Sequence, residues 1–408
     1  MTTSRQQLAE MPLNEIDVSH PALYQRNEIL DYFARLREEA PVHYCERSAY
    51  GPYWSVTRFD DIVSVDTQQD IYSSQKGGIQ IVDLEGELKR INFINMDPPD
   101  HGWRRKVVSP AVAPTNLALL ETTIRTRVCE ILDSLPKGEP FDWVDRVSIE
   151  LTTQMLATLF DFPFEERRKL TYWSEVATTS VVKGGLVESE AHRIEILQSC
   201  LAEFAALLQT RANMPPQPDM ISMMAHSDMA NMDAQEFVST LILLIVGGND
   251  TTRNSISGGL LALNDFPDEW EKLRSDHSLV ASLVPEIIRW QTPLTSMRRT
   301  TTRATELGGQ EIPQGAKVMM WYLSGNRDED AIPDANQFII DRENPRRHLS
   351  FGFGIHRCMG NRLAEMQLRI LWEEILNRDL DIKVLGAPER TYSNSVRGFT
   401  SMPVKIVS

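Results

Sequence analysis

The chain has 408 residues, 42% hydrophobic and 24% charged, which is the composition of a globular protein of one large or two ordinary domains. Its 42 Lys and Arg residues against 57 Asp and Glu residues leave a formal net charge of −15, which argues against a nucleic-acid partner. Residues 1–20 lack an apolar core, and the most apolar run, 237–246, is shorter than the ~20 residues that span a bilayer. We therefore expect a cytoplasmic protein without a signal peptide or membrane anchor.

The cysteines are scattered along the chain without a CxxC pair, at Cys45, Cys129, Cys200 and Cys358. This spacing indicates neither a disulfide framework nor a zinc site, and it fits a reducing compartment. Cys358 differs from the other three because it stands in a glycine-rich stretch, 351–360.

The N-terminal quarter predicts a small mixed region. Residues 1–26 are expected to form a loosely held arm, and residues 27–40 an amphipathic helix. Two short runs rich in β-branched and aromatic residues predict two strands of a hairpin-like sheet, followed by a helix over 59–68. The polar, glycine-rich stretch 73–95 predicts a long loop of the functional or disordered kind.

Two consecutive prolines end this loop, and a helix is predicted to begin near Asp100. His101 and Arg105 are four residues apart, so they share one face of that helix. A solvated basic turn is the alternative, and it remains the default interpretation for Arg104 and Lys106.

Residues 116–210 are almost wholly helical in pattern, interrupted by a glycine-containing connection at 178–189. The next helix, 236–265, is apolar on nearly every side of its first half, which is typical of a core helix. Gly247 and Gly248 in its middle cost about 1 kcal/mol each relative to Ala, so they need a reason. Close helix packing is one such reason.

Glu286 and Arg289 stand three residues apart on the following predicted helix, a pattern that is weak evidence by itself. The stretch 351–360 is stronger evidence for a functional site, because two glycines allow a tight turn before a helix begins. Cys358 lies where this loop enters the helix. Free backbone N–H groups at that position are expected to lower the thiol pKa and favour the thiolate. A buried structural cysteine is the alternative.

The stretch 351–360 resembles the haem-binding loop of the cytochrome P-450 family of haem-thiolate monooxygenases, through Phe351, Gly352, Gly354, His356, Cys358 and Gly360. The resemblance implies that Cys358 is the iron ligand of haem b. It further implies that His356 contacts a haem propionate and that Phe351 lies beside the thiolate. A thiolate ligand pushes electron density onto iron and favours O–O cleavage.

Further motifs of the family follow in the expected order. His101 and Arg105 match the HxxxR pair that binds the propionates, and Arg299 falls at another propionate-binding position. Asp250 and Thr251 match the oxygen-activating motif, in which an acid and an alcohol suit a proton relay. The resemblance assigns a structural triad to Glu286, Arg289 and Arg342, and a mobile substrate lid to residues 178–189.

The resemblance covers residue 97 to the C-terminus and implies a mainly α, single-domain haem-thiolate fold over 1–408 with a small β region. The implied reaction is reductive activation of O2 and insertion of one oxygen atom into a C–H bond of a small apolar substrate. The sequences of 96–117, 244–255, 293–309 and 348–376 are similar to the bacterial alkane-hydroxylase subfamily, which implies terminal hydroxylation of medium-chain alkanes, fatty acids or related terpenes. The expected substrate-lining residues are Leu243, Val246, Gly247, Leu294, Met297 and Phe399.

The chain shows no second flavin- or iron–sulfur-binding region, so electrons are expected from a separate ferredoxin and its reductase. An acidic partner would be steered to a local excess of base. The expected residues are Arg104, Lys106, Arg347, His348, Arg357 and Arg362. Three rivals stay open: a peroxide-driven peroxygenase, which would not need Asp250 and Thr251; a haem gas sensor or electron carrier; and a haem-free scaffold.

Overall fold

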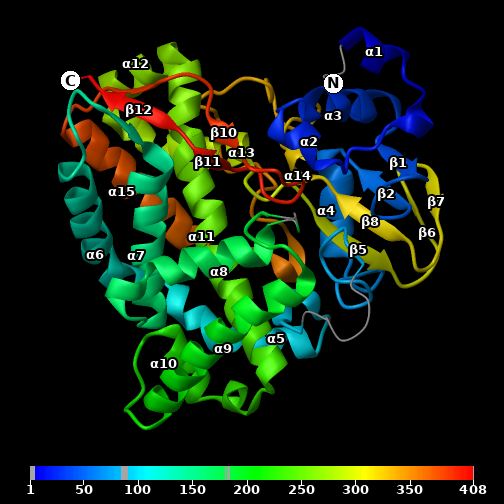
Figure 1. Cartoon of the computed structure of the whole chain (residues 1–408). Coiled ribbons are helices and arrows are strands. Elements are labelled where there is room, and N and C mark those ends of the chain that lie inside the picture. Colours follow the sequence, from blue (N-terminus) through cyan, green and yellow to red (C-terminus); the bar gives the residue numbers. More distant parts are fainter. Residues whose placement is uncertain (1–4, 84–90, 180, 182–183, 408) are drawn as a thin grey trace.

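The computed structural model describes residues 5–83, 91–179, 181 and 184–407. A large helical half lies beside a smaller half that holds a five-stranded sheet and the N-terminal helices (Figure 1). The prediction of a mainly α fold with a small β region is confirmed. Three predicted segments fall partly outside the described residues: 1–4 of the arm, 84–90 of the long loop, and 180 and 182–183 of the lid.

The five-stranded sheet has the order β1-β2-β8-β5-β3. Its strands are β1 (Val42–Cys45), β2 (Tyr53–Val56), β8 (Lys317–Met320), β5 (Met297–Thr301) and β3 (Tyr72–Ser73). β1 and β2 pair antiparallel, as the predicted hairpin requires, and β2 pairs parallel with β8. Since side chains alternate along a strand, Met297 and Arg299 share one face of β5.

The described part of the N-terminal arm is packed rather than loosely held, which corrects the prediction for residues 1–26. It forms α1 (Arg5–Glu10), a 3-10 turn η1 (Leu13–Glu15) and α2 (Pro21–Gln25). Leu8, Ile16 and Tyr24 are buried in one cluster with Trp321 of the sheet half. Periodicity did not predict this packing, because these apolar residues follow neither a helical nor a strand period. They lie in turns and short helices, and their side chains are buried there.

The helical half surrounds α11 (Ala234–Asp265), which is the predicted core helix. It contacts α7, α8, α9, α12, α13 and α15. The other helices of the chain are α3 (Ile29–Glu39), α4 (Phe59–Thr67), α5 (Asp100–Val108), α6 (Pro114–Asp133), α7 (Glu150–Phe160), α8 (Arg168–Thr178), α9 (Glu190–Ala212), α10 (Met220–Ala225), α12 (Pro267–Ser275), α13 (Val280–Gln291), α14 (Tyr322–Gly325) and α15 (Asn361–Asn377).

Short elements complete the fold. Three small sheets comprise β4 (Pro140–Asp142) with β12 (Pro403–Ile406) and β9 (Ile382–Val384), β10 (Glu389–Arg390) with β11 (Phe399–Ser401), and β6 (Thr305–Leu307) with β7 (Gln310–Ile312). Single-turn helices are η2 (Phe93–Asn95), η3 (Ser109–Val112), η5 (Phe164–Glu166), η6 (Asp228–Asn231), η7 (His277–Leu279) and η8 (Gly354–His356), and η4 (Val144–Ile149) is a π-helix.

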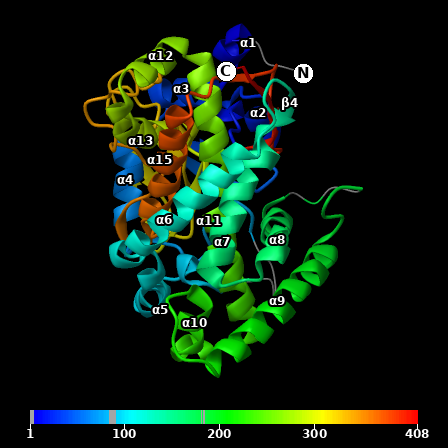
Figure 2. The ribbon, with the colours of Figure 1, turned by 90° about the vertical axis from the view of Figure 1, so that its left-hand side faces the viewer.

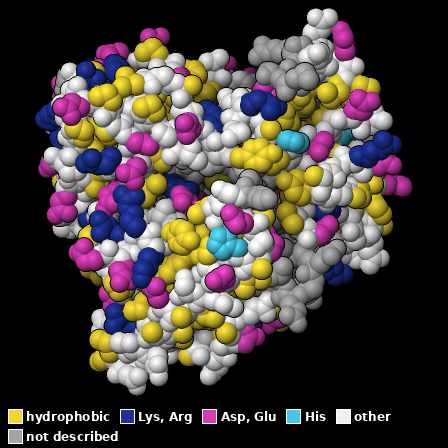
Figure 3. Space-filling model, viewed as in Figure 1, with side chains coloured by type: hydrophobic (Ala, Val, Ile, Leu, Met, Phe, Trp, Pro, Cys, Tyr) yellow, Lys and Arg dark blue, Asp and Glu magenta, His cyan; other side chains and the backbone are white. Residues whose placement is uncertain are grey.

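Helices α8 and α9 stand beside the bundle of α6, α7 and α11 (Figure 2). In α9 only Cys200 and Phe204 are buried, although the helix has 23 residues. Hydrophobic side chains gather over α8 on the face shown in Figure 3, where Lys and Arg are interspersed with Asp and Glu. Among the described residues, no helix is long and apolar enough to cross a membrane.

Candidate haem-thiolate site

The loop before α15 turns on two glycines in the left-handed region, Gly352 at φ +64° and Gly354 at φ +61°. A Cβ at Gly354 would lie 2.3 Å from the Asp66 carbonyl oxygen, so no side chain fits there. The Cys358 amide donates to the Phe351 carbonyl at 2.8 Å, closing the loop just before α15 begins at Asn361. The glycines therefore let the loop press against the end of α4 and hold Cys358 at the start of α15.

Cys358 has exposed surface, yet protein atoms surround the sulfur closely enough that burial raises the pKa of its thiol. Amide groups of Gly360 and Asn361, with Arg105 and Arg357, lower the pKa but do not compensate for burial. The predicted depression of the thiol pKa by the helix start is therefore wrong for the protein alone. Cys358 would be held as the thiolate by a bound metal cation, which would take the place of the proton.

Two histidines lie together near this loop. The rings of His101, on α5, and His356 are 4.5 Å apart between centroids, and the Ser74 hydroxyl lies 3.0 Å from His356 Nε2. His101 Nε2 and His356 Nδ1 are buried without a hydrogen-bond partner among the described residues. Burial, followed by the charge of Arg299, lowers the pKa of His356 to about 2, and burial also lowers the pKa of His101. Both rings are neutral at pH 7.

Two arginines bring positive charge to the same place. Arg105 Nη2 donates to the Arg357 carbonyl, and Arg299 on β5 donates from Nη1 to the Arg298 carbonyl at 2.8 Å. Arg299 Nη2 also forms an ion pair with Asp66 at 2.7 Å. The structure thus gathers His101, Arg105, Arg299 and His356 around the loop that carries Cys358.

This donor set fits haem. A sulfur ligand suits iron, and arginine with unpartnered imidazole nitrogens suits the two carboxylates of the porphyrin. The buried orphan nitrogens of His101 and His356 are expensive unless an acceptor satisfies them. The assignment of these four residues to the propionates stays a prediction.

On α11, the two central glycines serve different purposes. A Cβ at Gly248 would lie 2.7 Å from Leu156 Cδ2 on α7, so this glycine allows close helix packing. A Cβ at Gly247 would meet no described atom within 4 Å, and Gly247 is exposed in the middle of a core helix. An open space therefore lies against Gly247.

The predicted acid–alcohol pair is close in sequence but not hydrogen-bonded together. Thr251 Oγ1 donates to the Gly247 carbonyl at 2.9 Å. The Asp250 carboxylate is buried; Arg253 Nη2 lies 3.1 Å from Oδ1, and Thr178 of α8 donates to Oδ2 at 3.3 Å. A direct proton transfer between the two side chains would need Asp250 to leave these partners or a water to bridge them.

Five of the six expected substrate-lining residues have accessible surface, namely Leu243, Val246, Gly247, Leu294 and Met297. Phe399 is the exception: its side chain is 2% exposed in the core, and Arg390 lies 4.8 Å above its ring. Phe399 therefore offers almost no surface to a substrate. Its backbone amide donates to the Asn254 side chain, which holds this residue against α11. A separate surface hollow of about 520 Å³ beside Trp103 includes none of the six.

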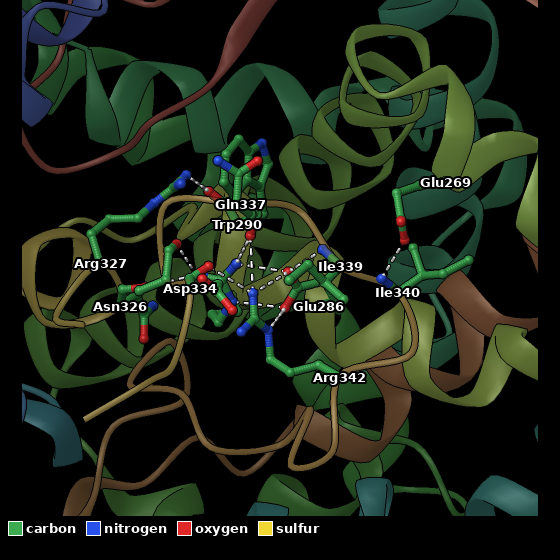
Figure 4. A network of polar contacts seen from close by, with 12 residues as sticks. Glu269, Glu286, Trp290, Asn326, Arg327, Asp334, Gln337, Ile339, Ile340 and Arg342 are labelled. Carbon is green, nitrogen blue, oxygen red and sulfur yellow. Dashed lines mark hydrogen bonds and ion pairs between the residues drawn. The ribbon is translucent and has the colours of Figure 1, made fainter. Parts of the chain in front are cut away.

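The triad expected behind the cysteine loop is assembled (Figure 4). Arg289 donates to both Glu286 oxygens at 2.7 Å, and Arg342 Nε donates to Glu286 Oε2 at 3.2 Å. Glu286 and Arg289 have fully buried side chains. Arg289 also donates to three backbone carbonyls of the irregular segment, at Asn326, Ala335 and Gln337.

Sequence reasoning missed Asp66, which links α4, β5 and the cysteine loop. The signal was present: Phe59, Ile62, Val65 and Asp66 together form the buried face of α4. A carboxylate within the apolar stripe of an amphipathic helix indicates a buried polar partner.

The expected basic surface is smaller than predicted. Arg104 Nε is paired with Glu236 at 2.5 Å, and the His348 side chain is buried. Burial, followed by Arg289, lowers the pKa of His348 to about 3, so this ring is neutral. Four residues of the set remain exposed: Lys106, Arg347, Arg357 and Arg362.

The chain is similar to one family model and to relatives of named activity. Residues 138–406 match the model of the family described as Cytochrome P450. The linalool 8-monooxygenase of Pseudomonas putida is 35% identical over 96% of this chain and 98% of its own. The steroid C26-monooxygenase of Mycobacterium tuberculosis is 30% identical over 94% of this chain and 90% of its own.

Two bacterial structures are more similar in sequence. CYP153D17 from Sphingomonas sp. PAMC 26605 is 48% identical with a TM-score of 0.92, and cytochrome P450-153 from Novosphingobium aromaticivorans is 45% identical with a TM-score of 0.89. Each comparison covers 96% of this chain and 99% of the other. A sulfur ligand on a glycine-rich loop, with donors for two carboxylates beside it, defines a haem-thiolate protein. The chain belongs to the cytochrome P450 family and is a haem-dependent monooxygenase.

Proposed function

We propose that this monooxygenase hydroxylates the terminal carbon of a medium-chain apolar substrate, such as an alkane, a fatty acid or a related terpene. The observation that carries the proposal is the open space at Gly247, in the middle of the core helix α11. Leu243 and Val246 flank it and are partly exposed, so the accessible wall is apolar. The similarity to two bacterial 153-type structures over nearly the whole chain supports it.

When haem is bound, it supplies the activation of O2 and the oxygen transfer. Cys358 would hold the iron, while His101, Arg105, Arg299 and His356 would hold the propionates. The protein's further contribution is to position the substrate chain along apolar walls and to exclude water from it.

Proton supply would pass through Asp250 and Thr251. The Thr251 hydroxyl hydrogen is directed to the Gly247 carbonyl, so its oxygen is free to accept a hydrogen bond from a water. Arg253 holds Asp250 and is shared with Glu175 of α8, which lies 2.9 Å away. A change in how α8 sits on α11 would therefore change how firmly Asp250 is held.

The test is a spectral titration with linear alkanes, fatty acids and terpenes of graded length, followed by identification of the hydroxylated carbon. We expect a substrate-induced change of the Soret band and oxygen at the chain terminus. Leu243→Phe should shift the preference to shorter chains, whereas Leu261→Phe, on the same helix but not among the predicted lining residues, should not. Exclusive hydroxylation of internal carbons would contradict the proposal. Peroxide-driven turnover that matches turnover with reducing equivalents would favour a peroxygenase.

We further propose that a separate ferredoxin, served by a reductase, delivers the electrons to the exposed basic side chains of Arg347, Arg357 and Arg362. An acidic partner would be steered there, and the association rate would fall as salt rises. Replacing these three arginines by Glu should slow reduction by ferredoxin and leave substrate titrations unchanged. The matched control replaces three exposed arginines elsewhere, Arg47, Arg146 and Arg303. Equal reduction rates in the two triple variants would contradict this docking surface.

A further inference from the structure

The Asp66 side chain joins three separate parts of the chain. It stands near the end of α4 and is 3% exposed. Its Oδ1 accepts from Arg299 Nη2 at 2.7 Å; its Oδ2 accepts from the Phe353 amide at 2.7 Å and from the Tyr322 hydroxyl at 3.2 Å. One carboxylate thus contacts β5, α14 and the loop that leads to Cys358.

The loop is also seated on the backbone of Asp66. A Cβ at Gly354 would lie 2.3 Å from the Asp66 carbonyl oxygen, and a Cβ at Gly352 would lie 3.2 Å from Asp66 Oδ2. The two left-handed glycines therefore allow the loop to close around this one residue. Any displacement of Asp66 would be transmitted directly to the segment just before Cys358.

Burying a carboxylate costs several kcal/mol unless it is paired and hydrogen-bonded. Here burial raises the pKa of Asp66, and the Arg299 charge and the three donors oppose that rise. A neutral side chain with a hydrogen-bond acceptor could hold the Phe353 amide, so loop closure alone does not require a charge. The charge does have one specific partner, because it fixes the direction of the Arg299 guanidinium.

We propose that Asp66 is a positioning residue for the haem. It sets Arg299, the predicted propionate-binding side chain on β5, relative to the loop that carries the iron ligand. Its buried negative charge also stabilises the ferric over the ferrous state and so lowers the reduction potential. Low dielectric surroundings screen such a charge poorly, so its effect reaches beyond its direct contacts.

The experiment compares haem release and reduction potential in holoenzyme variants. Asp66→Asn removes the charge, and we expect the ferrous-to-ferric ratio at a fixed potential to rise about tenfold, which is an upward shift of about 59 mV for one electron. Asp66→Glu keeps the charge but lengthens the side chain, so the potential should stay near that of the wild type while haem transfer to an acceptor protein becomes several-fold faster. Asp70→Asn is the matched control, because it removes an exposed carboxylate just beyond the same helix.

A purely structural role would change folding stability without moving the potential. The proposal is overturned if Asp66→Asn and Asp70→Asn have the same potential. If Asp66→Asn yields no holoenzyme, Asp66→Glu decides: wild-type haem release in that variant would overturn the positioning role, and faster release at an unchanged potential would support it.

Discussion

The cysteine-loop side of the molecule and the α8 side treat their buried charges differently. Glu286 and Asp66, which support the loop, each accept from two or more donors, and their arginine partners are buried with them. At the α8–α11 contact, Arg253 Nε and the hydroxyls of Thr171 and Ser174 are buried without partners among the described residues. Arg253 shares its charge between buried Asp250 and a Glu175 side chain that is 40% exposed.

An unsatisfied buried polar group costs about 1–3 kcal/mol. The carboxylates of Glu286 and Asp66 therefore have one well-determined arrangement, and the nitrogens of His101 and His356 beside the loop that lack a partner among the described residues match the predicted propionates. The α8 side gains from any water or rearrangement that supplies its missing partners. This contrast matches the roles predicted for the two sides: an iron ligand at Cys358 needs a fixed position, and a proton route through Asp250 needs alternatives.

The largest effect is expected at the ligand itself. Cys358→Ala should abolish the red-shifted Soret band that reduced, carbon-monoxide-treated wild-type protein shows, because no other thiolate replaces it. Cys129→Ala, at a half-buried cysteine on α6, is the control and should keep the band. Retention of the band in Cys358→Ala would mean that another residue holds the iron.

The second-largest effect is expected when the Glu286 carboxylate, which supports the loop, is removed. Glu286→Gln leaves Arg289 buried without its carboxylate, which costs about 3–5 kcal/mol. We expect a large drop in haem content and in the unfolding midpoint. Glu365→Gln removes the partner of Arg346, whose side chain is 73% exposed, and should cost at most about 1 kcal/mol. Similar losses in the two variants would mean that burial of the ion pair does not set its contribution to stability.

At the α8–α11 contact, Thr251→Ala should leave haem content and substrate affinity nearly unchanged. The fraction of reducing equivalents recovered as product should fall about tenfold, with hydrogen peroxide formed instead, since a positioned proton donor contributes at least that much. Thr252→Ala, at a neighbouring buried threonine, should stay coupled. Full coupling in Thr251→Ala would end the assignment of that hydroxyl to the relay.

A smaller, pH-dependent effect is expected at His348, which faces Arg289, Arg346 and Arg357. Its folded pKa of about 3 lies below the unfolded value of 6.5, so only the unfolded chain binds the proton between these values. Stability should therefore fall as the pH drops below 6.5, by about 1 kcal/mol over the first unit. His348→Asn keeps an acceptor for the Ser350 amide. In urea titrations at a series of pH values, this variant should show a smaller pH dependence of the free energy of unfolding below pH 6.5. The control variant His277→Asn, at an exposed histidine, should keep the pH dependence of the wild type.

Much of this site follows from sequence because its motifs are local. The loop, the HxxxR pair and the Glu286–Arg289 pair each use residues a few positions apart, so spacing alone places them on one face or one turn. The family resemblance also indicated Arg342, by its place in the irregular segment. What spacing could not give is tertiary: the burial of His348, the pairing of Arg104 with Glu236, and the packing of Phe399 depend on segments distant in sequence.

The N-terminal arm and Asp66 both show that contacts between segments distant in sequence are hard to predict. The arm has apolar residues without a period, so its packing against Trp321 left no local signal. Asp66 did leave one, as an acid within an apolar stripe, but its three partners come from β5, α14 and the cysteine loop. The pKa of Cys358 was misjudged because helix-start amides are local, whereas the desolvation that outweighs them comes from the whole fold.

The most direct test of the central claim compares two glycines one residue apart. Gly247→Ala should place a methyl group in the open space, leave the unfolding midpoint equal or slightly higher, and weaken the substrate-induced Soret change at least tenfold. Gly248→Ala should instead clash with Leu156 and cost about 1–3 kcal/mol of stability. A wild-type substrate titration in Gly247→Ala would contradict the placement of the substrate space.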